Sequence, residues 1–219
     1  QLELAQKTPS FTTTLRWRKA ENFQSTKRDW ESFWGFYWLY KDFPKHESVE
    51  NFLYAAFVSA NTAKHREKSI ELGAAYLANE KWMKFRPDVT FNMSNAYRLE
   101  AENQLKISVG LQNALSTSER AKAAEAAQKS EDYYKRFFDL CDSYLDLAHK
   151  PGADEKYKSY AQGFVNMMGS AYFKLRKYND LLEKFAGFEN GVMNRAKGYV
   201  NLPNFRTSPA MPSAHYMSG

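Results

Sequence analysis

The sequence predicts an all-α protein built of paired antiparallel helices, and three observations carry that expectation. Apolar residues recur at i, i+3 and i+4 along most of the chain, which is the spacing of an amphipathic helix face. Glycine and proline are few, at 10 and 7 of 219 residues, and proline falls mostly at apparent helix boundaries. No segment shows the alternating apolar and polar pattern of a half-buried strand.

Composition and charge narrow the classes of function. The formal net charge is +6, but lysine and arginine are interspersed with aspartate and glutamate. A nucleic-acid binder concentrates its basic residues in one patch, so we expect no nucleic-acid partner. The single cysteine, Cys141, excludes an internal disulfide and a thiol-rich metal site. No apolar run reaches the roughly 18 residues that cross a bilayer, so we expect no membrane span.

The N-terminal part contains an aromatic helix that bears on function. Residues 1–24 predict an extended or loosely helical arm anchored by Trp17, and Thr26 is placed to cap a helix over residues 26–43. The apolar side chains of this helix exceed one stripe. Either neighbouring helices cover it on several sides as a core helix, or part of it docks a partner through aromatic side chains. The candidate partner-binding residues, which lie off the main tryptophan stripe, are Phe36, Tyr40 and Phe43.

Further helices fill a domain that we place at residues 25–199. A break near residues 110–116 marks a candidate boundary inside this domain. Residues 200–219, with three prolines, predict an extended C-terminal tail. The helices of ordinary length are expected at residues 48–60, 63–81, 89–108, 153–175 and 178 into the 190s.

One helix is expected to be much longer than the others. Ser116 and Glu119 form a capping-box pattern, and nothing interrupts a helix over residues 117–149 before Pro151. At 1.5 Å per residue, such a helix is about 50 Å long. Its alanine-rich first half therefore either projects from the body or is interrupted near Gln128.

The stretch from residue 165 to residue 185 carries the most specific pattern in the chain. Two apolar helix faces flank a turn, with a glycine in the first helix where a partner helix can approach closely. The stretch resembles the helix-turn-helix unit of the tetratricopeptide repeat, a family whose surfaces bind other proteins. It departs from that family by carrying Arg176 where glycine often marks the turn. The matching positions, of which Leu181 replaces the usual alanine, are Met168, Gly169, Tyr172, Tyr178, Leu181 and Phe185.

No combination of residues predicts a catalytic, cofactor-binding or metal-binding site, so we expect a protein that is not an enzyme and uses no cofactor. The four histidines are scattered and none forms a metal-binding pair. Cys141 lies among aromatic residues, which is typical of a buried, inert thiol. The carboxylates of Asp139, Asp142 and Asp146 share one helix face, which is more typical of a solvated surface than of a cation site.

The function expected from the sequence is a protein-protein interaction scaffold or a structural subunit of a larger assembly. The alternative is a ligand-binding or enzymatic helical domain with a pocket among its aromatic side chains. The aromatic-rich, helical texture with a repeat-like stretch is similar to the flagellar coiling proteins of spirochaetes, which implies a periplasmic filament or self-assembly as the partner. Because the sequence starts at Gln1 rather than at methionine, we expect export to the periplasm, with the cytoplasm as the alternative.

Overall fold

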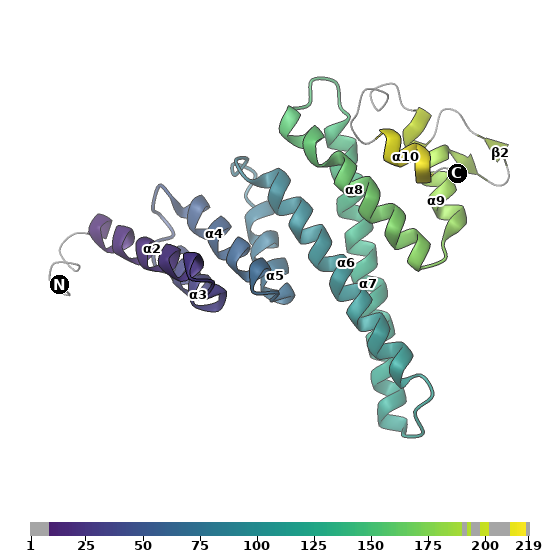
Figure 1. Ribbon diagram of the computed structural model, residues 1–219, viewed down its shortest axis with the longest axis horizontal. Helices are drawn as coiled ribbons and strands as arrows, with labels where there is room; N and C mark the ends of the chain where they lie inside the picture. Colours follow the sequence, from purple (N-terminus) through teal and green to yellow (C-terminus); the bar gives the residue numbers. More distant parts are fainter. Residues whose placement is uncertain (1–8, 190–191, 194–197, 202–210, 218–219) are drawn as a thin grey trace. The chain divides into compact units, whose positions relative to one another are not determined.

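The protein belongs to the all-α class, as expected (Figure 1). The computed structural model describes residues 9–189, 192–193, 198–201 and 211–217. Within these ranges helices account for nearly all secondary structure, and the exception is the antiparallel pair of two-residue strands β1 (Phe188–Glu189) and β2 (Val192–Met193). The chain divides into two compact units, residues 1–96 and 97–219, which are described separately.

The first unit consists of helices that pack against their neighbours in chain order. Helix α3 contacts α2 on one side and α4 on the other, and α4 also contacts α5. The division between the units falls inside α6, and the candidate boundary at 110–116 stays a prediction. The helices of the first unit are α2 (Pro9–Ser25), α3 (Asp29–Asp42), α4 (Val49–Thr62), α5 (Arg66–Leu77) and the start of α6 (Arg86–Leu111).

The core of the first unit depends on two close approaches between helices. A Cβ atom added at Gly35 of α3 would lie 2.7 Å from Cβ of Ala20 in α2. A Cβ atom added at Gly73 of α5 would lie 2.7 Å from Sδ of Met93 in α6. At Gly35 the two helices therefore approach more closely than a larger residue would allow, whereas at Gly73 the flexible Met93 side chain occupies the space of the missing Cβ. The largest fully buried side chains of the first unit are Phe33, Phe36, Leu39, Leu53, Phe57, Leu72 and Tyr76.

A buried hydrogen-bond network ties α4 and α5 to the segment that leads into α6. The hydroxyl group of Tyr76 donates to the carboxylate of Glu50 and accepts from the backbone N–H of Phe85 at 2.9 Å. Burial, followed by the hydrogen bond to Glu50, raises the pKa of Tyr76 far above its usual range. The hydroxyl therefore stays protonated and holds both partners.

The second unit is built on one long helix. Helix α7 (Thr117–Ala148) is a single element of 32 residues, which confirms the expected long helix and excludes a break near Gln128. The other elements are the rest of α6, α8 (Glu155–Lys174), α9 (Tyr178–Ala186), the 3-10 helix η1 (Tyr199–Asn201) and α10 (Met211–Met217).

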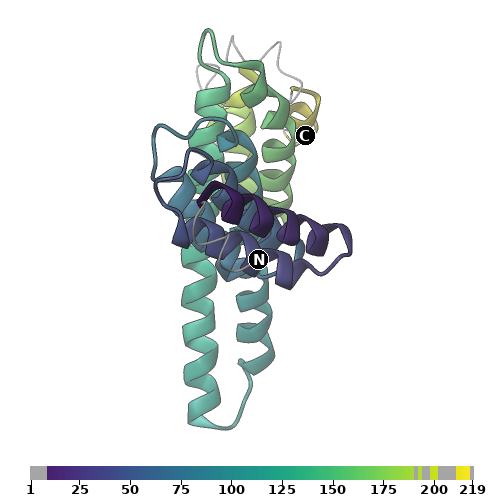
Figure 2. The same ribbon diagram turned by 90° about the vertical axis from the view of Figure 1, so that its left-hand side faces the viewer.

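The two halves of α7 have different partners. Its second half packs against α8, where the Phe138 ring stacks on Tyr172 at 4.5 Å and the Tyr144 ring stacks on Phe164 at 4.1 Å between centroids. Its first half pairs with α6, and the Ser130 hydroxyl donates to the carbonyl oxygen of Ala101 at 2.9 Å. Figure 2 shows this α6–α7 hairpin continuing past one end of α8, so the first half of α7 projects as expected.

The same tight turn closes three helix pairs: α2–α3, α4–α5 and α8–α9. In each turn the middle residue is basic and has a left-handed backbone, with φ of 59° at Lys27, 58° at Lys64 and 56° at Arg176. Two backbone hydrogen bonds close the end of the first helix, from residues C′ and C″ to the carbonyls of C2 and C3. This is the Schellman pattern, which usually has glycine at C′.

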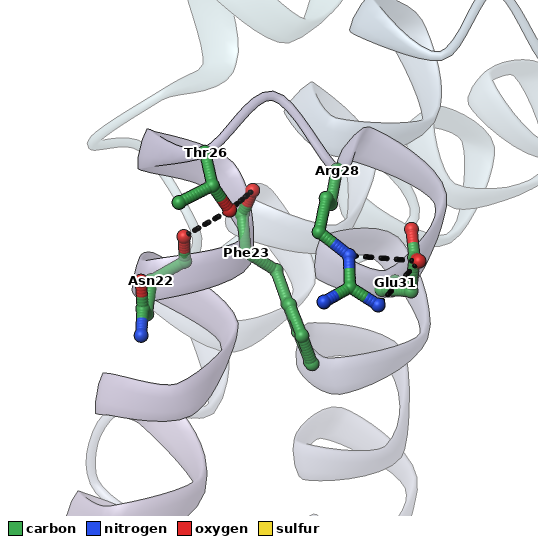
Figure 3. Close-up of polar contacts among 5 residues, drawn as sticks. All are labelled: Asn22, Phe23, Thr26, Arg28 and Glu31. Carbon is green, nitrogen blue, oxygen red and sulfur yellow. Dashed lines mark hydrogen bonds and ion pairs between the residues drawn. The ribbon is translucent and has the colours of Figure 1, made fainter.

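Side chains reinforce the first of these turns (Figure 3). The Thr26 hydroxyl lies 2.8 Å from the carbonyl oxygen of Asn22 and 3.1 Å from that of Phe23, and it donates there. The Arg28 guanidinium group binds the Glu31 carboxylate at 2.7 and 3.0 Å. Thr26 therefore closes the end of α2 and does not cap α3, because its hydroxyl bonds back to carbonyls of the preceding turn.

Both ends of the chain differ from the expected arm and tail. Residues 9–25 form the regular helix α2, and Trp17 anchors it as expected, with its ring 4.7 Å from that of Phe36. Residues 211–217 form α10 rather than an extended tail, and α10 packs against α8 and α9. The prolines predict extended chain. Pro9 and Pro212 instead lie in the first turns of these helices, where proline is tolerated. Residues 200 and 201 of the expected tail belong to η1, and the remaining residues of both segments lie outside the described residues.

Across the described residues, none of the helices combines the length and the apolar character that a membrane span requires.

Candidate functional site

The first unit contains a groove between α2 and α4. We call it the α2–α4 groove; its volume is about 600 Å³. This size lies within the range typical of ligand-binding clefts. Four segments line it: α2, one residue of α3, the linker into α4 with α4 itself, and the residue just before α6. The lining residues are Thr13, Thr14, Trp17, Arg18, Glu21, Gln24, Phe36, His46, Ser48, Asn51, Phe52, Tyr54, Ala55, Val58 and Phe85.

Aromatic rings form the floor of the groove. The Trp17 ring lies 4.7 Å from Phe36 and 5.7 Å from Phe52 between centroids. Phe36 and Phe52 are 1% and 4% exposed, so surrounding helices hold both rings in place. Trp17 itself is only half-buried and offers apolar surface to the groove.

A second aromatic pair forms one wall. The rings of Tyr54 and Phe85 stack with a centroid distance of 3.7 Å and an interplanar angle of 1°. The Tyr54 hydroxyl donates to the Asp88 carboxylate at 3.0 Å, which fixes the ring from its far end. The Lys84 ammonium group lies 4.7 Å from the Phe85 ring and donates to the Asn51 side chain at 3.1 Å. The wall is therefore preorganised, with a positive charge beside it.

Polar groups are placed at defined positions in the groove. Nδ1 of His46 accepts from the backbone N–H of Ser48 at 3.0 Å, so the neutral ring carries its proton on Nε2. That Nε2 lies 3.5 Å from the Thr13 hydroxyl, which is nearly buried. Arg18 and Glu21 pair at 2.9 Å on the α2 rim, where both side chains remain partly exposed. An aromatic floor flanked by such donors and acceptors suits an extended peptide with an apolar anchor.

The structure corrects the prediction that Phe36, Tyr40 and Phe43 are the exposed aromatics of α3. Phe36 is 1% exposed and belongs to the core, while Tyr40 and Phe43 are half-buried. The exposed residues are instead Trp30 and Trp38, at 42% and 51%. The reason is that α2 and α4 flank α3 and cover Ser32, Phe33, Phe36 and Leu39.

Neither of the half-buried aromatics lies in the α2–α4 groove. The Phe43 ring lies under the Arg16 guanidinium group at 5.7 Å. Tyr40 lies beside the end of α5, where it shares a shallow hollow with Trp82. Their expected role in binding a partner remains a prediction, whereas Phe36 can act only as part of the groove floor.

A second, smaller hollow of about 450 Å³ lies between α2 and α3, around the contact of Gly35 with Ala20. Trp34 and Trp38 line it from α3, with their rings stacked 6.1 Å apart. Its charged rim is largely neutralised, since Arg16 pairs with Asp42 at 2.5 Å. Trp38 is 51% exposed, so this part of α3 faces outward.

The repeat-like stretch folds as the expected helix pair α8–α9. Met168, Gly169, Tyr172, Leu181 and Phe185 are all buried, as the sequence predicts. Tyr178 opens α9 and is 49% exposed, with its ring set edge-on to Phe173. Arg176 occupies the left-handed position of the turn.

The candidate chemical residues of the second unit fall into different environments. Cys141 is 0% exposed in the core. Asp139 is exposed, whereas Asp142 accepts from the Tyr199 hydroxyl at 3.1 Å and pairs with Lys184 at 2.6 Å. In the described part of the chain, no three or more His, Cys, Asp or Glu side chains are placed to hold a metal ion.

Comparison with known proteins gave no match, whether against family models, curated proteins or solved structures. The resemblance to tetratricopeptide repeats therefore stays a prediction from residues 165–185.

Proposed function

We propose that this protein is a non-enzymatic scaffold or structural subunit that binds another protein, and that its first unit holds an extended segment of the partner in the α2–α4 groove. The observation that carries the proposal is the half-buried Trp17 ring, held in place by the buried rings of Phe36 and Phe52, beside the half-buried Tyr54–Phe85 wall. Buried aromatic anchors supply most of the energy at protein interfaces.

The polar groups of the groove favour a peptide over a purely apolar ligand. Gln24 and Asn51 bring side-chain amides, which both donate and accept hydrogen bonds and so match a peptide backbone. The three tight helix hairpins support the repeat-like character of the chain, and helical-repeat surfaces commonly present such grooves to partners.

A peptide library displayed on phage and panned against the full chain tests this proposal. Enriched peptides should bind the wild-type protein, and Ala55→Arg in the groove should weaken that binding about tenfold or more because the long charged side chain fills the site. Ala74→Arg is the matched control, since Ala74 is exposed on α5 and lies outside the groove. Equal binding by both variants, or no enrichment over an empty support, would rule the groove out.

The identity of the partner is a separate proposal, and it rests on the resemblance to spirochaete flagellar coiling proteins. We propose a periplasmic filament as the partner. Co-sedimentation of the purified protein with isolated flagellar filaments tests it, and a protein that stays in the supernatant at all concentrations would exclude it. The groove proposal does not depend on this outcome.

A further inference from the structure

The second unit contains a pocket that four helical elements build together. Its volume is about 400 Å³, and α7, α8, α9 and η1 each contribute to its lining. We call it the acidic pocket, because carboxylates outnumber cations among its residues. The lining residues are Asp146, Tyr172, Asp180, Glu183, Lys184, Gly198 and Tyr199.

The carboxylates of this pocket are largely unneutralised. Asp146 and Glu183 make no side-chain hydrogen bond or ion pair with any part of the chain that the structure describes. Among the residues that the structure describes, Asp180 forms an ion pair with Lys177 at 3.8 Å, and both side chains are more than half exposed. The lining is therefore negative, although the whole chain carries a net charge of +6.

Lys184 shows that an ammonium group is bound beside this pocket. Its ammonium group pairs with the Asp142 carboxylate at 2.6 Å and lies 5.6 Å from the centre of the Tyr199 ring. A carboxylate and an aromatic ring together are a favourable environment for an organic cation. The chain's own lysine takes up Asp142 and leaves the other carboxylates for a ligand.

Tyr172 supplies an independent observation that points to a ligand. Its side chain is 8% exposed and lines the pocket, and its ring is fixed by stacking on Phe138. Within the described residues its hydroxyl makes no hydrogen bond. The ring is buried, but the hydroxyl oxygen is open to the pocket, so it can form a hydrogen bond with a ligand that enters there. Burial first, then the carboxylates of Asp142 and Asp180, raises the pKa of Tyr172, so the group stays a neutral hydroxyl that can accept from a cation.

We propose that the acidic pocket binds an organic cation that carries primary ammonium or guanidinium groups. The carboxylates surround the pocket without converging on one point, and among the described residues none of their groupings is suited to a metal ion. An elongated ligand with several N–H donors can instead reach Asp146, Glu183 and the Tyr172 hydroxyl at once. The ligand is either a free polyamine or a lysine or arginine side chain of a partner protein. This proposal does not depend on the function proposed for the α2–α4 groove.

Isothermal titration calorimetry of the full chain tests the proposal with two probes, spermidine and a short acetylated peptide that contains one lysine. At least one of them should bind saturably at one site. Glu183→Gln and Tyr172→Phe should each weaken that binding about tenfold, as expected for loss of one charge-assisted hydrogen bond. Tyr172→Phe keeps the ring that stacks on Phe138, so the fold is preserved. The matched control is Asp139→Asn, which removes an exposed carboxylate of α7 outside the pocket and should change nothing.

The two probes also separate the sources of the cation. Tighter binding of spermidine assigns the pocket to a free polyamine, and tighter binding of the peptide assigns it to a partner's side chain. The proposal is overturned if neither probe saturates at millimolar concentration. It is also overturned if Asp139→Asn weakens binding as much as the pocket variants do, or if magnesium chloride at matched ionic strength displaces the probe, because the attraction would then be a general one for cations.

Discussion

Replacing Gly35 by alanine sets two opposing effects against each other. Alanine is favoured over glycine inside a helix by about 0.8–1 kcal/mol, which on its own would stabilise α3. The new Cβ atom, however, would lie 2.7 Å from Cβ of Ala20 and 3.4 Å from its Cα. Carbon atoms in good contact are about 3.5–4.0 Å apart, and alanine has no rotamer with which to move aside. Helices α2 and α3 must therefore separate, and overpacking of this kind costs about 1–3 kcal/mol. We expect a net loss of about 1 kcal/mol in the free energy of unfolding.

A second substitution should reverse the sign of the effect of Gly35→Ala on the free energy of unfolding. In an Ala20→Gly background the atom at 2.7 Å is gone, and the nearest remaining neighbour is the Cα at 3.4 Å. Gly35→Ala should then stabilise the protein by about 0.5–1 kcal/mol through helix propensity alone. The double-mutant cycle gives the coupling between the two positions directly. Gly110→Ala is the control, because nothing lies within 4 Å of its added Cβ and it should stabilise α6 in any background.

Urea unfolding followed by tryptophan fluorescence suits the measurement. The five tryptophans all belong to the first unit, so their signal reports on the helices that the substitution disturbs. The Gly110→Ala control is followed by far-ultraviolet circular dichroism. If Gly35→Ala stabilises the protein equally with and without Ala20→Gly, the close approach of α2 and α3 is wrong. The tryptophans are Trp17, Trp30, Trp34, Trp38 and Trp82.

Three further substitutions test other features. Phe36→Ala should lower the free energy of unfolding by about 3–5 kcal/mol, since the ring is fully buried. A urea midpoint close to that of the wild type would show that Phe36 is not a core residue. Tyr76→Phe should cost about 1–3 kcal/mol, because it leaves the Phe85 N–H and the Glu50 carboxylate without their shared partner; an unchanged thermal midpoint would contradict the network. Lys64→Val should destabilise the α4–α5 turn by about 1–2 kcal/mol, whereas Lys64→Gly should not, because a branched side chain is strained at φ of 58°; equal melting curves for the two variants would count against the turn geometry.

The sequence predicts long elements well where start and stop signals are strong. Helix α7 ends within one residue of its predicted end, because Ser116 precedes its first turn and Pro151 with Gly152 follows its last. Thr26 shows the limit of such signals. A threonine between two helices can cap the second or close the first, and local sequence does not separate these roles.

The aromatic helix α3 shows why its exposed face was misassigned. The sequence correctly indicates that its apolar residues exceed one stripe. Which stripe is buried depends on where α2 and α4 pack, and helix periodicity contains no information about that. Phe36 was therefore expected outside and lies inside, while Trp38 lies outside.

The two pockets could not be predicted from spacing in the chain. Asp146 belongs to the carboxylate row and Tyr172 to the repeat-like stretch, and each was noted for a different reason. Their neighbour Tyr199 comes from η1, which no periodic pattern indicated. Only the packing of four separate elements brings the three side chains to one pocket.

The three-residue turns also affect how the chain acquires its structure. Each joins two helices that contact each other directly, so these helix pairs form between residues close together in sequence. Loop closure costs little entropy over such short distances, and proteins dominated by local contacts fold fastest for their size. The α2–α3 and α4–α5 hairpins can therefore form on a ribosome-bound chain before the second unit has been synthesised, which shortens the time during which the tryptophan-rich segment is open to aggregation.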